Sequence, residues 1–205
     1  MESSTATIEF TRIYLALFYT FVAAFYAIRI TTEKRCQQHE VIFPGNNFST
    51  TWWNHMVFRV FRVTIWAVCV MRVFTPSLDG YLGIIPTLNV SPILLTGNIL
   101  LTGGFLLTMG VHLHLGHQWR SGIDPEAPPQ LWTRGPYSFS RNPMFLGVAT
   151  AQAGFFLALP SVFSGICLLL GWYTLHRQTR EEEAYLRERF PTDYVAYSDR
   201  VRRWL

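Results

Sequence analysis

The sequence predicts an all-α integral membrane bundle of about five transmembrane helices, with a C-terminal helical hairpin and an amphipathic tail. Half of the 205 residues are hydrophobic, and they gather in five apolar segments. A helix needs roughly 20 residues, and at least about 17, to cross the hydrocarbon core of a bilayer. We therefore expect one membrane-embedded domain over residues 1–205, with spans near residues 13–30, 56–74, 93–113, 144–159 and 162–177.

The first segment is expected to be a retained helix. A signal peptide starts with a basic region, whereas residues 1–10 contain acidic residues and the first basic residue is Arg12. The second segment covers residues 56–74, and the third, at 93–113, meets the length of a span cleanly. Small residues let membrane helices approach closely. We therefore assign to the third segment a packing seam formed by Gly97, Gly103, Gly104 and Gly110.

The fourth and fifth segments are short when taken alone, but Pro160 and Ser161 divide one long apolar run into two arms. A single span of that whole length would overshoot the bilayer, which favours an antiparallel hairpin. Pro143 suits the first position of the hairpin, where its missing N–H leaves no helical hydrogen bond unmade. Beyond the second arm, large apolar side chains recur every three or four residues, which predicts an amphipathic tail at the membrane interface. They are Tyr194, Tyr197, Val201 and Trp204.

The distribution of basic residues predicts the topology. The formal net charge is +4. Lys34 and Arg35 follow the first segment and seven arginines follow the last, whereas residues 75–92 contain no Lys or Arg. Because basic loops stay in the cytoplasm, we expect the N-terminus outside and the C-terminus inside, and Arg72 alone does not fit. Orientation explains arginines that flank spans, so the basic balance does not indicate a nucleic-acid partner.

Ionisable residues lie at both free ends of the hairpin. Arg141 and Asn142 precede its first helix, and three glutamates at 181–183 follow its second span. Because a tight turn returns both ends to the same side of the bilayer, we expect these groups to be neighbours. The glutamates either form a solvated helix face or hold a ligand ammonium or the nearby arginines. Tyr137 and Phe139 fit either an interfacial aromatic belt or a pocket for a cation and an adenine ring.

Three histidines near the end of the third segment do not predict a metal site. His112 and His114 cannot share a helix face, whereas His114 and His117 can. No neighbouring Cys or carboxylate has the spacing of metal ligands, so we assign the histidines to an interfacial helix end. The sequence also lacks the Gly-x-Gly-x-x-Gly, P-loop and Gly-x-Ser-x-Gly patterns. A nucleotide-like cofactor would therefore bind outside the familiar soluble α/β folds.

A set of short motifs is spread through the C-terminal half: Gly135-Pro-Tyr137, Arg141-Asn-Pro143, Gly147, Glu182-Glu183-x-x-Leu186, Phe190, Tyr194-x-x-Tyr197 and Val201-x-Arg203. With these motifs the sequence from Gly116 onward resembles the isoprenylcysteine carboxyl methyltransferase family, and more broadly the membrane methyltransferases that include the phospholipid N-methyltransferases. The resemblance implies a multi-span helical enzyme that binds S-adenosylmethionine at the cytoplasmic end of its last helices. It also implies methylation of a lipophilic acceptor, typically the terminal carboxylate of a prenylated cysteine, and in a eukaryote a place in the endoplasmic reticulum membrane.

Some positions depart from the family pattern. Asn142 stands where many members have His, Phe145 where Tyr is common, and Pro191 where Gly usually follows the Phe. The stretch from His117 to Arg120 replaces an Asn-Phe-x-His segment of the prenylcysteine enzymes. These departures leave other hydrophobic acids, phenols, amines and thiols open as acceptors.

The resemblance implies roles for particular residues. An α-carboxyl group titrates near about 3.5, so a carboxylate acceptor needs no general base, and alignment with the methyl group is what the site must supply. Arg120 or Arg134 would orient that carboxylate, and His117 is the candidate base for an amine or thiol. The candidate catalytic residues are Arg120, Arg134 and Arg141. The candidate cofactor-binding residues are Tyr137, Arg141, Asn142, Pro143, Glu182 and Glu183.

Two other functions stay open at this stage. A membrane reductase that uses NADPH on a sterol-like substrate shares the multi-span shape and the basic loops. The glutamates at 181–183 favour a cationic cofactor over a dinucleotide, whose phosphates they would repel. A non-catalytic membrane interaction protein would bind neither cofactor. Membrane lipid is an expected partner in all three cases.

Overall fold

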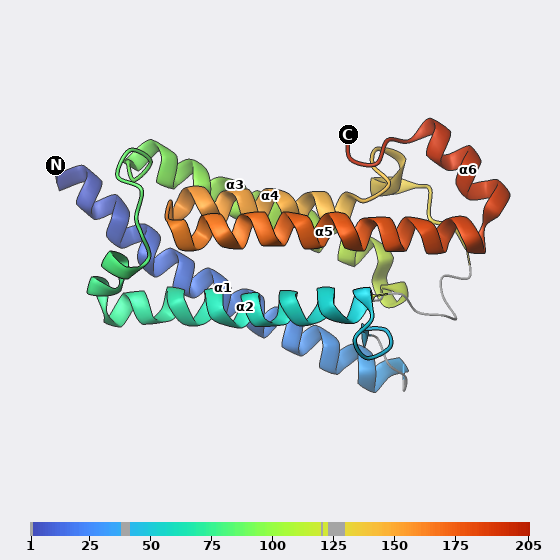
Figure 1. The fold of residues 1–205 in the computed structure, drawn as a ribbon, viewed down its shortest axis with the longest axis horizontal. Coiled ribbons are helices and arrows are strands. Elements are labelled where there is room, and N and C mark those ends of the chain that lie inside the picture. Colours follow the sequence, from blue (N-terminus) through green and yellow to red (C-terminus); the bar gives the residue numbers. More distant parts are fainter. Residues whose placement is uncertain (1, 38–41, 120, 123–129) are drawn as a thin grey trace.

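The computed structural model describes residues 2–37, 42–119, 121–122 and 130–205, and they are mostly helical, as predicted (Figure 1). Figure 1 shows α3, α4 and α5 side by side in one layer and α1 and α2 in a second. In the same view α6 lies at the end opposite the N-terminus, and the chain then turns back to its C-terminus above the second half of α5. The helices are α1 (Glu2–Gln37), α2 (Thr50–Phe74), α3 (Ser91–Leu115), α4 (Pro143–Ala158), α5 (Val162–Arg189) and α6 (Pro191–Arg200). Single 3₁₀ turns are η1 (Pro76–Tyr81), η2 (Gly116–Gln118) and η3 (Gly135–Ser138), and the two-residue strands β1 (Ile42–Phe43) and β2 (Ser121–Gly122) pair in parallel.

The helical hairpin is confirmed. Ser161 lies between α4 and α5 and begins α5 with a reciprocal capping box. Its side-chain oxygen accepts from the Ser164 amide at 3.2 Å, and the Ser164 hydroxyl accepts from the Ser161 amide at 3.2 Å. Two of the N–H groups that a helix start leaves unpaired are thereby satisfied inside an apolar region.

The packing seam between α3 and α4 uses half of the predicted glycines. A methyl group at Gly97 or Gly104 would overlap the backbone of α4. Gly147 and Gly154 on α4 face α3 in the same way, so the two backbones approach as small-residue seams allow. The assignment of Gly103 and Gly110 to the seam is wrong, because both point into open space.

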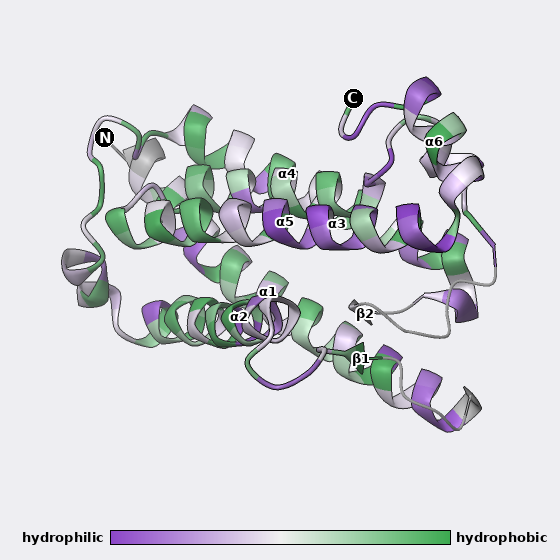
Figure 2. Cartoon of the chain, turned by 45° about the vertical axis from the view of Figure 1, so that its right-hand side comes forward, coloured by the Kyte–Doolittle hydropathy of each residue, from purple (hydrophilic) through white to green (hydrophobic). Residues whose placement is uncertain are grey.

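Fewer helices meet the length and hydropathy of a membrane span than the sequence predicts. Among the described residues, two helices are long and apolar enough to cross a membrane, Thr5–Arg35 and Ser91–Gln118, and α4 is apolar but shorter. Figure 2 shows α5 changing from hydrophobic to hydrophilic along its length. A bundle of about five transmembrane helices therefore stays a prediction.

A partly buried ionic cluster accounts for the arginine that does not fit the charge pattern. Asp79 of η1 accepts from Arg72 of α2 at 2.5 Å and from Arg12 of α1 at 2.9 Å. Burial raises the pKa of Asp79, but the hydrogen bonds from Arg72 and Arg12 outweigh it and hold that pKa below its ordinary value. Arg72 is therefore neutralised within the fold.

Candidate functional site

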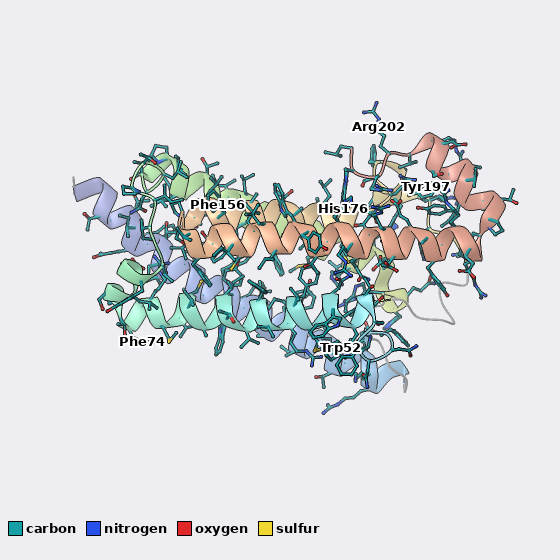
Figure 3. The ribbon with its side chains drawn as sticks, in the orientation of Figure 1. Trp52, Phe74, Phe156, His176, Tyr197 and Arg202 are labelled. Carbon is teal, nitrogen blue, oxygen red and sulfur yellow. The ribbon has the colours of Figure 1, made fainter. Side chains whose placement is uncertain are left out.

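The two helical layers enclose a cavity of about 720 Å³, within the usual size of a small-molecule site. One end is polar and is formed by the N-terminus of α4, the second half of α5 and α6. The other end, which we call the apolar arm, continues between α1, α2, α3, α4 and α5. Figure 3 shows Trp52 and Phe74 at opposite ends of α2, with Tyr197 at the Trp52 end, where the polar region lies. The apolar arm is lined by residues that include Tyr19, Phe61, Ile65, Leu101, Phe155 and Leu168.

At the polar end, Glu183 is the centre of an ionic network. Arg203 donates to both of its carboxylate oxygens, with the shortest distance 2.8 Å from Nη2 to Oε2. Asn142 Nδ2 donates to Oε1 at 2.9 Å, and Arg141 Nε lies 3.6 Å from the same oxygen. The predicted proximity of Arg141 and Asn142 to the glutamates is thus confirmed. Burial raises the pKa of Glu183, but the hydrogen bonds from Arg203 and Asn142 hold it below its ordinary value.

The network holds the start of α4 against the C-terminal residues. The Arg203 carbonyl accepts from the Ser140 hydroxyl at 3.1 Å and from Asn142 Nδ2 at 3.3 Å. The Arg141 amide donates to the Arg202 carbonyl at 2.9 Å. Pro143 is buried as the first residue of α4 and lies outside the cavity wall. Asn142, Glu183 and Arg203 therefore satisfy one another, and their first role is to fix the shape of the polar end.

Glu182 is the acidic group that faces the cavity without such a network. Gln178, one helical turn earlier, donates to its Oε1 at 2.9 Å. In the part of the chain that the structure describes, no Lys or Arg pairs with Glu182. Burial raises its pKa to about 7, and the hydrogen bond from Gln178 only partly opposes that rise. A half-buried carboxylate in this state has a strong preference for a cationic neighbour.

Aromatic side chains line the polar end of the cavity beside the two glutamates. Tyr137 of η3 lines the cavity, and burial, followed by the charge of Glu182, raises the pKa of its hydroxyl. Tyr194 and Tyr197 of α6 are 1% and 3% exposed and line the same region. The Tyr197 hydroxyl donates to the Tyr137 carbonyl at 2.6 Å. The amphipathic tail is therefore present, but its Tyr194 and Tyr197 pack on the site instead of facing the bilayer.

The remaining predicted residues are spread more widely. Arg134 is exposed and does not line the cavity. His117 also lies outside the cavity wall and contacts Glu33, with 2.9 Å between His117 Nδ1 and Glu33 Oε2. Arg120 lies outside the described residues. Arg141 is the one candidate catalytic arginine that the described structure places in the cavity wall, and its buried Nε lacks a hydrogen-bond partner.

Several cavity residues were not among the sequence candidates. Gln178 was detectable, because it lies one helical turn before Glu182 on the same face. The contribution of α2, which includes His55, Arg59 and Arg62, had no such signal. Among the described residues, no three His, Cys, Asp or Glu side chains come together as metal ligands would.

Residues 93–193 match the family model described as phospholipid methyltransferase, a family of membrane methyltransferases. The matched segment runs from α3 into α6. It contains the polar end of the cavity except for the cavity residues that follow residue 193. The match supports the broader resemblance to membrane methyltransferases, and the narrower one to isoprenylcysteine carboxyl methyltransferases stays a prediction. No curated protein and no solved structure matches the chain.

Proposed function

We propose that this protein is a membrane methyltransferase that takes its methyl group from S-adenosylmethionine and transfers it to a lipophilic acceptor. One observation carries the proposal. An uncompensated carboxylate, Glu182, lies at the polar end of a cavity whose other end is an apolar arm. That arrangement suits a cationic cofactor beside a substrate with an apolar tail, and the family match over residues 93–193 supports the same reading.

The residues at the polar end fit this cofactor. S-adenosylmethionine carries an ammonium, a carboxylate and an adenine, and it supplies a methyl group that its sulfonium makes electrophilic. Glu182 would hold a positive group. Arg141, whose Nε makes no hydrogen bond although it lies 3.6 Å from Glu183 Oε1, would attract the carboxylate of the cofactor. Tyr137 would offer a ring face to the adenine or to the cationic centre. Glu183 and Asn142 would act indirectly by holding Arg141 and the start of α4 in place.

Catalysis would then rest on alignment. A carboxylate acceptor is ionised at neutral pH and needs no proton removed, so the site must bring its oxygen into line with the methyl group and exclude water. The aromatic wall formed by Tyr137, Tyr194 and Tyr197 would exclude water at the polar end. The finer expectation, carboxyl methylation of a prenylated cysteine in the endoplasmic reticulum membrane, is part of this proposal. Other hydrophobic acids, phenols, amines and thiols stay as alternative acceptors.

A binding titration separates the enzymatic alternatives. Purified protein in neutral detergent would be titrated by calorimetry with S-adenosylmethionine and, separately, with NADPH. We expect saturable binding of S-adenosylmethionine that NADPH does not displace, because Glu182 attracts a cation and repels phosphates. Binding of NADPH alone would favour a reductase, and binding of neither compound would favour a non-catalytic interaction protein.

A further inference from the structure

The wall of the cavity on α2 carries a basic patch, which we define as His55, Arg59 and Arg62. These residues lie on the first half of α2, near the polar end of the cavity. Trp66, one turn further along, donates to Thr20 of α1 and marks where the wall becomes apolar. Arg59 and Arg62 are exposed and His55 is half-buried, so a ligand in the cavity can reach all three side chains.

The arginines of the patch differ from the other arginines around the bundle. Arg203 pairs with Glu183 at 2.8 Å, and Arg72 pairs with Asp79 at 2.5 Å. Within the described residues, neither Arg59 nor Arg62 has a carboxylate partner within 4.0 Å. Arg62 Nε instead donates to the Phe58 carbonyl at 3.2 Å, which turns the side chain back toward the polar end of α2.

The patch is therefore a site of uncompensated positive charge. Arg59 and Arg62 repel one another. Burial, followed by the charges of Arg62 and Arg59, lowers the pKa of His55. Arg59 and Arg62 are three residues apart on one helix face, and an anion between them would relieve the repulsion of their like charges. Planar guanidinium groups bind carboxylate and phosphate oxygens in pairs, so two arginines on one wall form a receptor for such an anion.

The position of the patch links it to the proposed cofactor site. Asn54, immediately before His55, donates to Gln178 at 3.3 Å, and Gln178 donates to Glu182 at 2.9 Å. Arg62 lies eight residues after Asn54, or about 12 Å along the helix. An anion on the patch would thus lie at the junction between the polar end and the apolar arm.

We propose that the basic patch binds the anionic headgroup, a carboxylate or a phosphate, of a lipophilic ligand whose tail occupies the apolar arm. The inference rests on the proposed function, because it makes that ligand the methyl acceptor. It replaces Arg120 and Arg134, the arginines expected from the sequence, with residues of α2. If the acceptor is a carboxylate, methylation removes the charge that the patch recognises, so the neutral ester is held less tightly than the acid.

The test compares the binding of an acid and its ester. Farnesylcysteine and its methyl ester would each be titrated into the purified protein in neutral detergent. We expect the acid to bind at least about tenfold more tightly than the ester, the factor that one charge-assisted hydrogen bond supplies. The double variant Arg59→Gln/Arg62→Gln should bind both equally. Arg62→Lys should keep part of the preference, and Arg189→Gln, an exposed arginine at the end of α5, should keep all of it.

The outcomes separate this inference from the proposed function. Equal binding of acid and ester by the parent protein overturns the inference, and so does a preference that survives in the double variant. A parallel titration with S-adenosylmethionine reports independently on the cofactor site, which the double variant leaves intact. Repeating the acid titration with an anionic phospholipid in the micelle identifies the source of the headgroup. If the phospholipid weakens binding of the acid to the parent but not to the double variant, the patch binds a lipid phosphate. If the phospholipid does not weaken binding of the acid, the patch binds the carboxylate.

Discussion

The binding of S-adenosylmethionine should depend on pH through one residue, Glu182. Burial raises the pKa of this carboxyl to about 7, against an ordinary value of 4.5. The cationic cofactor is attracted only to the ionised form. Below pH 7 most molecules of the free protein hold a proton on Glu182, and that proton must leave before the cation binds. We therefore expect the affinity to fall as the pH is lowered through 7.

The size of the effect follows from the pKa. A group with a pKa of about 7 is ionised in roughly ten of eleven molecules at pH 8 and in roughly one of eleven at pH 6. The dissociation constant should therefore rise about tenfold between pH 8 and pH 6. The variant Glu182→Gln removes a charge-assisted hydrogen bond of about 1.5–3 kcal/mol, so at pH 8 it should bind about ten- to a hundredfold more weakly than the parent.

Calorimetric titrations at pH 6, 7 and 8 measure both effects. Glu182→Gln should lose most of the pH dependence. Titration of the cofactor itself affects the parent and the variant alike, so the difference between the two proteins reports on Glu182. The matched control is Glu181→Gln, because Glu181 is the neighbouring carboxylate and is exposed outside the cavity. The reasoning is refuted if Glu182→Gln binds as tightly as the parent at pH 8, or if it shows the same pH dependence.

Three further predictions test the architecture around the site. Glu183→Gln should lower the free energy of unfolding by about 3 kcal/mol. This is the low end for breaking a buried ion pair, because the Arg203 side chain is 37% exposed. Thermal unfolding in detergent measures the loss, and a loss no larger than that of Glu181→Gln would contradict the prediction. Gly154→Ala should destabilise the protein by about 1–3 kcal/mol, because the added methyl group overlaps α3 in the seam. Gly103→Ala should not destabilise the protein, because its methyl group meets nothing within 4 Å. Equal melting temperatures of the two variants would count against the seam. Tyr81 of η1 is 87% exposed, so Tyr81→Cys should react with an impermeant maleimide. The reagent should reach Tyr81→Cys and Leu205→Cys from opposite sides of the membrane. Labelling of both cysteines from one side would overturn the predicted topology.

Much of the fold could be predicted because its signals are local. Length and hydropathy located the five long helices, and Pro160 with Ser161 marked the hairpin. Periodicity alone could not orient the third segment, because Gly97 and Gly104 are seven residues apart and so are Gly103 and Gly110. Each pair shares a helix face. The facing pair Gly147 and Gly154 on α4 decides which face is packed.

The site was predictable only where its residues meet through the hairpin. The turn brings Arg141 and Asn142 to Glu183, and the sequence indicated that contact. The contact of Arg203 with Glu183 depends on the chain returning past α6, which no periodic pattern specifies. The sequence also could not tell Glu182 from Glu183, because their difference lies in which one the arginines neutralise. The arginines of α2 entered only with the packing of one helical layer on the other.

Transfer of labelled methyl groups tests the central claim most directly. Purified protein would be incubated with S-adenosylmethionine labelled in its methyl group and with farnesylcysteine or a membrane lipid extract as acceptor. We expect label to enter the organic extract with the parent protein and with Glu181→Gln, and about ten- to a hundredfold less with Glu182→Gln at subsaturating cofactor. Base-labile volatile methanol would identify a carboxyl ester. Label that stays in the aqueous phase with both acceptors, at saturating cofactor, would contradict the account.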